Sequence, residues 1–171
     1  MSSTIGVQNI AHTNGTNAMT VSSGGVVTQP NNPMFKVKGV DNIALTNNTY
    51  TKVTFNSEEF DVGGYYDSTT NYRYTPQVAG KYFIYGKVYI TYGSSAVENI
   101  YIAIYKNGVL VDKFQSLMGT TNYGSVQTSS LIEMNGSSDY VEIYTKASHS
   151  TDAVYYSGGT LGEFSGYRIG G

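Results

Sequence analysis

The 171-residue sequence contains no cysteine and no tryptophan, and only 13% of its residues are charged. The absence of cysteine excludes disulfides, thiolate metal sites and a cysteine nucleophile. A chain of this length can nevertheless bury the core of one domain without such crosslinks. The charged fraction is about half of what globular proteins usually carry, which is unusual for an enzyme.

Three further absences bear on partners and location. The chain has 10 basic and 12 acidic residues and no cluster of lysines or arginines, so nucleic acid is not an expected partner. No apolar run approaches the ~18 residues that span a bilayer, so membrane insertion is not expected. Residues 1–6 lack the basic and apolar regions of a signal peptide, which predicts a soluble product made in the cytoplasm.

The residues that are abundant favour β-structure. The 17 tyrosines and 20 glycines suit half-buried strands and turns respectively. Asn107-Gly108 between two apolar runs predicts a hairpin, because a type I′ turn needs positive φ at both positions. No helical periodicity persists. An all-β sandwich is therefore expected, with strands near residues 35–38, 43–46, 50–55, 58–62, 81–91, 98–105, 109–115, 126–134, 139–146 and 163–169.

Residues 1–33 are predicted to form an extended N-terminal β arm, followed by a head domain at residues 34–171. The arm contains no aromatic residue, so it cannot form a core of its own. Asn14-Gly15 and Gly24-Gly25 predict turns, and Pro30 and Pro33 favour a hinge. The arm is expected to pair with the head, with other copies or with another protein through Ile5, Val7, Ile10, Met19 and Val21.

Two of the predicted strands, within 81–91 and 98–105, are apolar on both faces. In a two-sheet sandwich the outer face normally meets water and is polar. Tyrosines on that face indicate that neighbouring subunits cover it, although the arm, a long loop or simple exposure are alternatives. The residues predicted for the subunit interface or the core are Tyr82, Phe83, Tyr85, Tyr89, Tyr101, Tyr105, Phe164 and Tyr167.

Several ordered motifs resemble the signature of the complement C-one-q/tumour-necrosis-factor superfamily. They comprise Phe60, Tyr66-Asp67, Tyr74, Pro76 and Gly80-Lys81-Tyr82, then Lys106-Asn107-Gly108, Leu131 to Tyr144, and Phe164-Ser165-Gly166-Tyr167. The resemblance covers about residues 35–170, with Ile84 in place of the usual phenylalanine. It implies a ten-stranded jelly roll that forms a homotrimer through aromatic-rich faces. No carboxylate cluster matches the calcium site of some members, so no cofactor is expected.

The segment from His12 to Pro30 is similar to strand–turn units of bacteriophage fibre and capsid-decoration proteins. This resemblance implies a virion protein whose arm binds the major capsid protein or another virion protein and whose head is displayed. The alternative is a tail-fibre or receptor-binding tip that recognises a host surface protein or glycan. A secreted cell-surface ligand of the same superfamily would need a signal sequence.

No catalytic or metal-binding residue is predicted. Ser148, His149 and Asp152 are close in sequence, but a strand or loop points neighbouring side chains apart, and His12 has no acidic neighbour. The densest carboxylates are Glu58, Glu59, Asp61 and Asp67, for which a solvated face is favoured over calcium binding or glycoside hydrolysis. A glycan-active enzyme is thus a remote alternative. Loops at 63–72, 91–97, 117–125 and 147–160 are expected to form outer binding tips.

Overall fold

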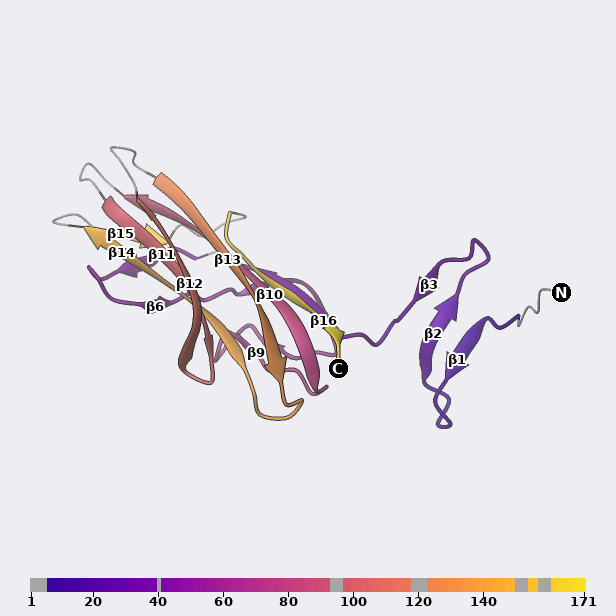
Figure 1. The fold of residues 1–171 in the computed structure, drawn as a ribbon. Coiled ribbons are helices and arrows are strands. Elements are labelled where there is room, and N and C mark those ends of the chain that lie inside the picture. Colours follow the sequence, from indigo (N-terminus) through magenta and orange to yellow (C-terminus); the bar gives the residue numbers. More distant parts are fainter. Residues whose placement is uncertain (1–5, 40, 93–96, 118–122, 150–153, 157–160) are drawn as a thin grey trace. The chain divides into compact units, whose positions relative to one another are not determined.

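The computed structural model describes residues 6–39, 41–92, 97–117, 123–149, 154–156 and 161–171. All regular elements in these ranges are β-strands (Figure 1). The chain divides into two compact units, Met1–Asn32 and Pro33–Gly171. The described residues include no helix long and apolar enough to cross a membrane.

The N-terminal unit is an antiparallel sheet in the order β1-β2-β3, formed by β1 (Asn9–Ala11), β2 (Asn17–Val21) and β3 (Val27–Thr28). Both turn predictions are confirmed, because Gly15 and Gly25 adopt φ of 87° and 79° and donate backbone hydrogen bonds to His12 and Ser22. None of residues 6–32 is buried. The sheet therefore has no core of its own, as a strand-rich segment without aromatic residues predicts.

The C-terminal unit is a sandwich of two sheets that pack face to face (Figure 1). The seven-stranded sheet has the order β5-β15-β10-β16-β4-β7, with β13 also paired to β10. Its strands are β4 (Met34–Lys38), β5 (Ile43–Leu45), β7 (Ser57–Val62), β10 (Gly80–Tyr92), β13 (Tyr123–Met134), β15 (Val154–Tyr156) and β16 (Glu163–Gly170).

The six-stranded sheet has the order β12-β11-β14-β9-β8, with β6 also paired to β14. Its strands are β6 (Thr51–Lys52), β8 (Tyr66–Asp67), β9 (Arg73–Tyr74), β11 (Val97–Lys106), β12 (Val109–Leu117) and β14 (Val141–His149). β12 and β11 form the predicted hairpin, in which Asn107 and Gly108 have φ of 52° and 77°.

The core lies between the two sheets and is filled by alternate residues of their strands. β10 contributes Tyr82, Ile84, Val88 and Ile90, and β11 contributes Ile100, Ile102 and Ile104, all fully buried. Aromatic packing closes one end, where Phe35 stacks on Tyr74 with ring centroids 4.0 Å apart. Each such side chain stabilises the fold by roughly 2 kcal/mol relative to exposure.

The all-β sandwich prediction is confirmed, and each of the ten predicted strands overlaps an observed one. Several predicted boundaries differ from the observed ones, two of them for a clear local reason. The strand expected at 50–55 shrinks to β6, because Phe55 donates its amide locally to Val53. The strand expected at 139–146 begins only at Val141, because the Asn135 side chain holds residues 135–139 in a turn by accepting the amides of Ser137, Ser138 and Asp139.

Candidate interaction surfaces

An apolar stripe crosses the outer face of the seven-stranded sheet. Cross-strand register places Leu131 opposite Phe83, Phe83 opposite Tyr167, Tyr167 opposite Met34, and Met34 opposite Val62. The rings of Phe83 and Tyr167 contact each other, while Leu131 and Tyr167 are 68% and 50% exposed. The stripe thus presents contiguous apolar surface from five strands to the outside of the unit.

Polar residues border this stripe on the same face. Tyr85 donates its hydroxyl to Gln127 over 2.8 Å. Lys36 forms ion pairs of 3.1 Å and 3.6 Å with Glu59 and Glu163, and Lys38 also pairs with Glu59. An apolar centre with a polar border is the usual anatomy of a protein–protein interface.

A second exposed apolar surface lies along β12, an edge strand of the six-stranded sheet. Its exposed apolar residues are Val109, Leu110, Val111, Phe114 and Leu117. An exposed apolar edge strand is a template for association, and soluble proteins usually protect such edges with charge. On β12 this protection is limited to two charged side chains, Asp112 and Lys113, among five exposed apolar ones.

The outer face of the six-stranded sheet carries a cluster of four tyrosines, which we call the tyrosine face: Tyr50, Tyr101, Tyr105 and Tyr144. Tyr50 makes edge contacts with Tyr101 and Tyr105 at centroid distances of 6.5 Å and 6.1 Å, and Tyr105 packs on Tyr144 at 4.5 Å. These rings cover Ala103, which is fully buried although it lies between Tyr101 and Tyr105 on that strand.

Charged groups lie within the tyrosine face. The Lys146 ammonium stands 4.1 Å from the ring centroid of Tyr101 and 5.1 Å from that of Tyr50. Lys52 forms an ion pair with Glu142, a residue that is only 4% exposed. Burial, followed by the nearby Tyr105 and Tyr101, raises the pKa of Tyr50; burial and the Glu142 carboxylate raise the pKa of Tyr144 to about 12.

The eight residues predicted for the interface or the core occupy three different places. Tyr82 and Phe164 are fully buried in the core. Phe83, Tyr85, Tyr89 and Tyr167 lie on the outer face of the seven-stranded sheet, where Tyr89 also stacks on Tyr123. Tyr101 and Tyr105 lie on the tyrosine face, so the structure does not bring them together with the other six.

The described contact residues predicted for the arm are exposed or half-exposed, and all of them except Val7 lie on strands. Val7 and Ile10 are 47% and 49% exposed, and Met19 and Val21 on β2 are partly covered. Val7 and Val21 line a shallow surface pocket of about 420 Å³ within this unit. Ile5 lies outside the described residues.

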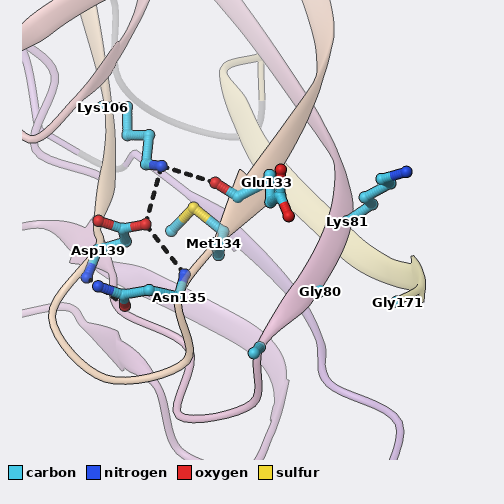
Figure 2. A pocket seen from close by; sticks show the side chains of 9 residues that line it. Gly80, Lys81, Lys106, Glu133, Met134, Asn135, Asp139 and Gly171 are labelled. Carbon is cyan, nitrogen blue, oxygen red and sulfur yellow. Dashed lines mark hydrogen bonds and ion pairs between the residues drawn. The ribbon is translucent and has the colours of Figure 1, made fainter.

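A pocket of about 530 Å³ opens at one end of the sandwich, between the starts of β10 and the last residues of β13 and β16 (Figure 2). Lys106 donates to the Glu133 carbonyl over 2.7 Å and pairs with Asp139 at 2.8 Å. Asp139 also accepts the amide of Asn135 over 3.0 Å, while Lys81 points away from this group. Lys106, Asp139 and Asn135 are therefore engaged in holding the 135–139 turn.

The residues considered as catalytic or metal-binding candidates do not form a reactive site within the described residues. Ser148 donates to Glu98 over 3.3 Å, and both ring nitrogens of His149 are buried without a partner among described atoms; Ser150, Thr151 and Asp152 lie outside the described residues. No group of three or more His, Asp or Glu side chains in the described residues could hold a metal ion. Loops 91–97, 117–125 and 147–160 are only partly described.

The predicted carboxylate group is divided among structural roles. Glu59 pairs with Lys36 and Lys38, and Asp61 accepts the Tyr66 amide over 2.7 Å while burial raises its pKa. Asp67 accepts the backbone amides of Thr69, Thr70 and Asn71 at 3.1, 2.9 and 3.0 Å, which holds its pKa well below the usual range. Glu59, Asp61 and Asp67 thus each serve a local fold element, while Glu58 is exposed.

Comparison with known proteins supports the sandwich. No protein-family model and no curated protein sequence matches the chain. Among solved structures, the globular domain of zebrafish complement 1qA protein superposes with a TM-score of 0.60 at 16% identity, over 81% of this chain and 97% of that one. The Eiger tumour necrosis factor from S. frugiperda gives 0.59 at 9%, over 81% and 93%, and murine APRIL at pH 5.0 gives 0.56 at 11%, over 81% and 99%. The predicted jelly-roll fold of the complement C-one-q/tumour-necrosis-factor type is therefore confirmed, and the likeness extends to fold alone.

Proposed function

We propose that this chain is a non-enzymatic structural protein of a bacteriophage virion that forms a homotrimer. The head trimerises through the apolar stripe of the seven-stranded sheet, and the N-terminal arm binds the major capsid or another virion protein. The observation that carries the assembly is the row Leu131–Phe83–Tyr167–Met34–Val62, which exposes apolar side chains from five strands. The assignment to a bacteriophage particle is supported by the segment from His12 to Pro30, which is similar to segments of phage fibre and capsid-decoration proteins.

Two different apolar surfaces favour a ring over a symmetric dimer. The stripe lies on the face of one sheet, and Phe114 and its neighbours lie on the edge of the other sheet. A surface that contacts a different surface of the next copy forms a heterologous interface, which closes into a ring when the rotation permits. Three copies can each contribute one face and one edge, which leaves neither exposed.

The arm supports attachment because its sheet cannot be stable in isolation. A small sheet needs a buried apolar face, and none of residues 6–32 is buried. Its edge strands offer unpaired backbone groups to which a partner can add a strand. Val7, Ile10, Val26 and Val27, each between 47% and 60% exposed, would then become buried against that partner.

The location of the protein in a purified particle tests this function. Quantitative mass spectrometry and cryo-electron microscopy of particles should find many copies on icosahedral sites, each with its arm bound to the particle and its head projecting. A few copies confined to the tail would instead support the receptor-binding tip, and absence from the particle would contradict both roles. Particles assembled with a chain that carries Val7→Asp and Ile10→Asp should lack the protein, while Lys81→Gln should not change incorporation.

A further inference from the structure

The tyrosine face differs chemically from the apolar stripe. The row of the stripe consists of leucine, phenylalanine, tyrosine, methionine and valine without a charged side chain, whereas the centre of the tyrosine face consists of phenol rings interleaved with Lys146, Lys52 and Glu142. The aliphatic residues of that outer face, Leu110 and Leu117, lie on the edge strand β12. A face of this kind offers aromatic area and hydrogen-bonding groups together, and it is not built to exclude water as a subunit seam is.

Lys146 has an unusual position within this face. Its ammonium is held between the rings of Tyr50 and Tyr101, and no carboxylate of a described residue lies within ion-pair distance of it. The other central lysine, Lys52, is by contrast paired with Glu142. The rings hold the Lys146 ammonium in place through cation–π attraction, and its free N–H groups can donate to an anion from solvent.

The surrounding polar groups add neutral hydrogen-bonding capacity. Gln115, which lies opposite Tyr101 in the strand register, donates its side-chain amide to the Asn99 side-chain oxygen over 2.7 Å. One nitrogen and one oxygen of this amide pair remain available for further bonds. The ring of Tyr50 lies against those of Tyr101 and Tyr105, with centroids 6.5 Å and 6.1 Å apart.

We propose that the tyrosine face binds an acidic saccharide. Tyr50 and Tyr101 stack on the C–H faces of sugar rings, whose partial positive charge matches the negative face of a phenol ring. Lys146 pairs with a carboxylate of the sugar, and the Gln115–Asn99 amides bond its hydroxyls. This inference goes beyond the proposed assembly by naming a class of ligand for the head, and the binding site itself depends on neither the arm nor the trimer.

Binding of defined oligosaccharides to the full chain tests the proposal. The acidic probe is a hexasaccharide of alginate, a polyuronate, and the neutral probe is maltohexaose. In isothermal titration calorimetry at low salt, the acidic probe should bind about tenfold more tightly, because a charge-assisted hydrogen bond contributes roughly 1.5 kcal/mol. Raising the salt concentration should reduce this preference.

Matched variants separate the two contributions. Lys146→Gln should remove the preference for the acidic probe, while Lys81→Gln, on the other sheet, should leave it unchanged. Tyr101→Ala should abolish binding of both probes, and Tyr101→Phe, which keeps the ring and the fold, should retain it. Equal affinity for both probes, an unchanged preference in Lys146→Gln or loss of binding in Lys81→Gln would each overturn the assignment.

Two further outcomes distinguish this inference from the proposed assembly. A trimer that binds neither probe would overturn the saccharide site and leave the assembly standing. A monomer that binds the acidic probe through Lys146 would support the saccharide site and contradict the trimer. Protection of Lys146 from amine labelling in the trimer, before any saccharide is added, would show a protein partner on this face and overturn the proposal.

Discussion

Phe83 on β10 and Tyr167 on β16 lie side by side with ring centroids 5.5 Å apart, and Tyr167 remains 50% exposed after this contact. The pair forms the middle of the apolar stripe, so a charge there should oppose assembly. We expect Phe83→Asp to convert the trimer to a monomer, because a carboxylate in a dry interface costs about 3 kcal/mol per contact. Analytical ultracentrifugation of the variant measures the change.

The same experiment can decide how the subunits meet. Phe114→Asp, on edge strand β12, should also yield monomers, and mixing it with Phe83→Asp should yield heterodimers. This follows because one copy then supplies an intact face and the other an intact edge. A symmetric interface would leave the mixture monomeric. Tyr101→Asp, on the tyrosine face, should leave the trimer intact, and its dissociation would show that this face also contacts a neighbour.

The next prediction concerns the loop that Asp67 organises between β8 and β9. Asp67 accepts hydrogen bonds from Thr70, Thr69 and Asn71, and these donors favour its charged form. We expect Asp67→Asn to lower the free energy of unfolding by about 1 kcal/mol at pH 7, since a weaker acceptor replaces the carboxylate. Urea unfolding followed by circular dichroism measures this difference.

The effect of Asp67 should depend on pH in a defined direction. Because the folded-state pKa of Asp67 is lowered, its contribution is present above the unfolded pKa of about 3.9 and is lost as pH falls below it. The difference between wild type and Asp67→Asn should therefore shrink as the pH falls from about 6 to about 2, a range that brackets the unfolded pKa of about 3.9. Glu58→Gln serves as the exposed-carboxylate control, and a gap that widens in acid would contradict the role of Asp67.

Alternation along β10 was sufficient to show that both of its faces are apolar, although the prediction grouped Tyr82 with Phe83 and Tyr85 as interface or core residues. Tyr82 and Ile84 are fully buried, whereas Phe83 and Tyr85 point to the outer face, as a period of two requires. The Asn107-Gly108 turn was likewise predictable, because its left-handed backbone is a local property. These features depend on neighbours in sequence.

Features that depend on strand register could not be predicted in the same way. Tyr85 and Tyr101 were grouped together because each lies on the second face of its strand, yet the two strands belong to different sheets. Met34 and Leu131 join the stripe only through their positions opposite Tyr167 and Phe83. Tyr50 reaches Tyr101 by tertiary contact alone, so the tyrosine face has no signature in sequence.

Gly136 provides a steric test of the turn beside the pocket of Figure 2. It has φ of 71°, and a Cβ built on it would lie 2.2 Å from the backbone nitrogen of Ala79. We expect Gly136→Ala to destabilise the head by at least about 2 kcal/mol, because backbone must move in addition to the left-handed strain. Thermal unfolding monitored by calorimetry measures the loss.

Gly64 supplies the matched control for that substitution. Its φ of 68° is similar, but a Cβ there would meet nothing within 4 Å. Gly64→Ala should therefore cost only about 1 kcal/mol, the price of the left-handed conformation alone. Equal destabilisation by the two substitutions would mean that the contact between Gly136 and Ala79 adds nothing.

The ion pair between Lys52 and Glu142 beneath the tyrosine face allows a last prediction. Glu142 is 4% exposed, and Lys52 also donates to the Asn71 carbonyl over 3.0 Å. Lys52→Met should destabilise the head by about 3 kcal/mol, because it leaves a buried carboxylate whose other side-chain hydrogen bond among the described residues is with the Tyr144 hydroxyl at 3.4 Å. Glu142→Gln should lower the free energy of unfolding by less, since the Lys52 side chain is 30% exposed and its ammonium can be hydrated.

A double-mutant cycle measured by urea unfolding tests whether the two side chains act through each other. The two substitutions together should destabilise the head by less than the sum of their separate effects, by about 1 kcal/mol or more. Strict additivity would show that the lysine stabilises the sheet through its contact with Asn71 and not through the carboxylate.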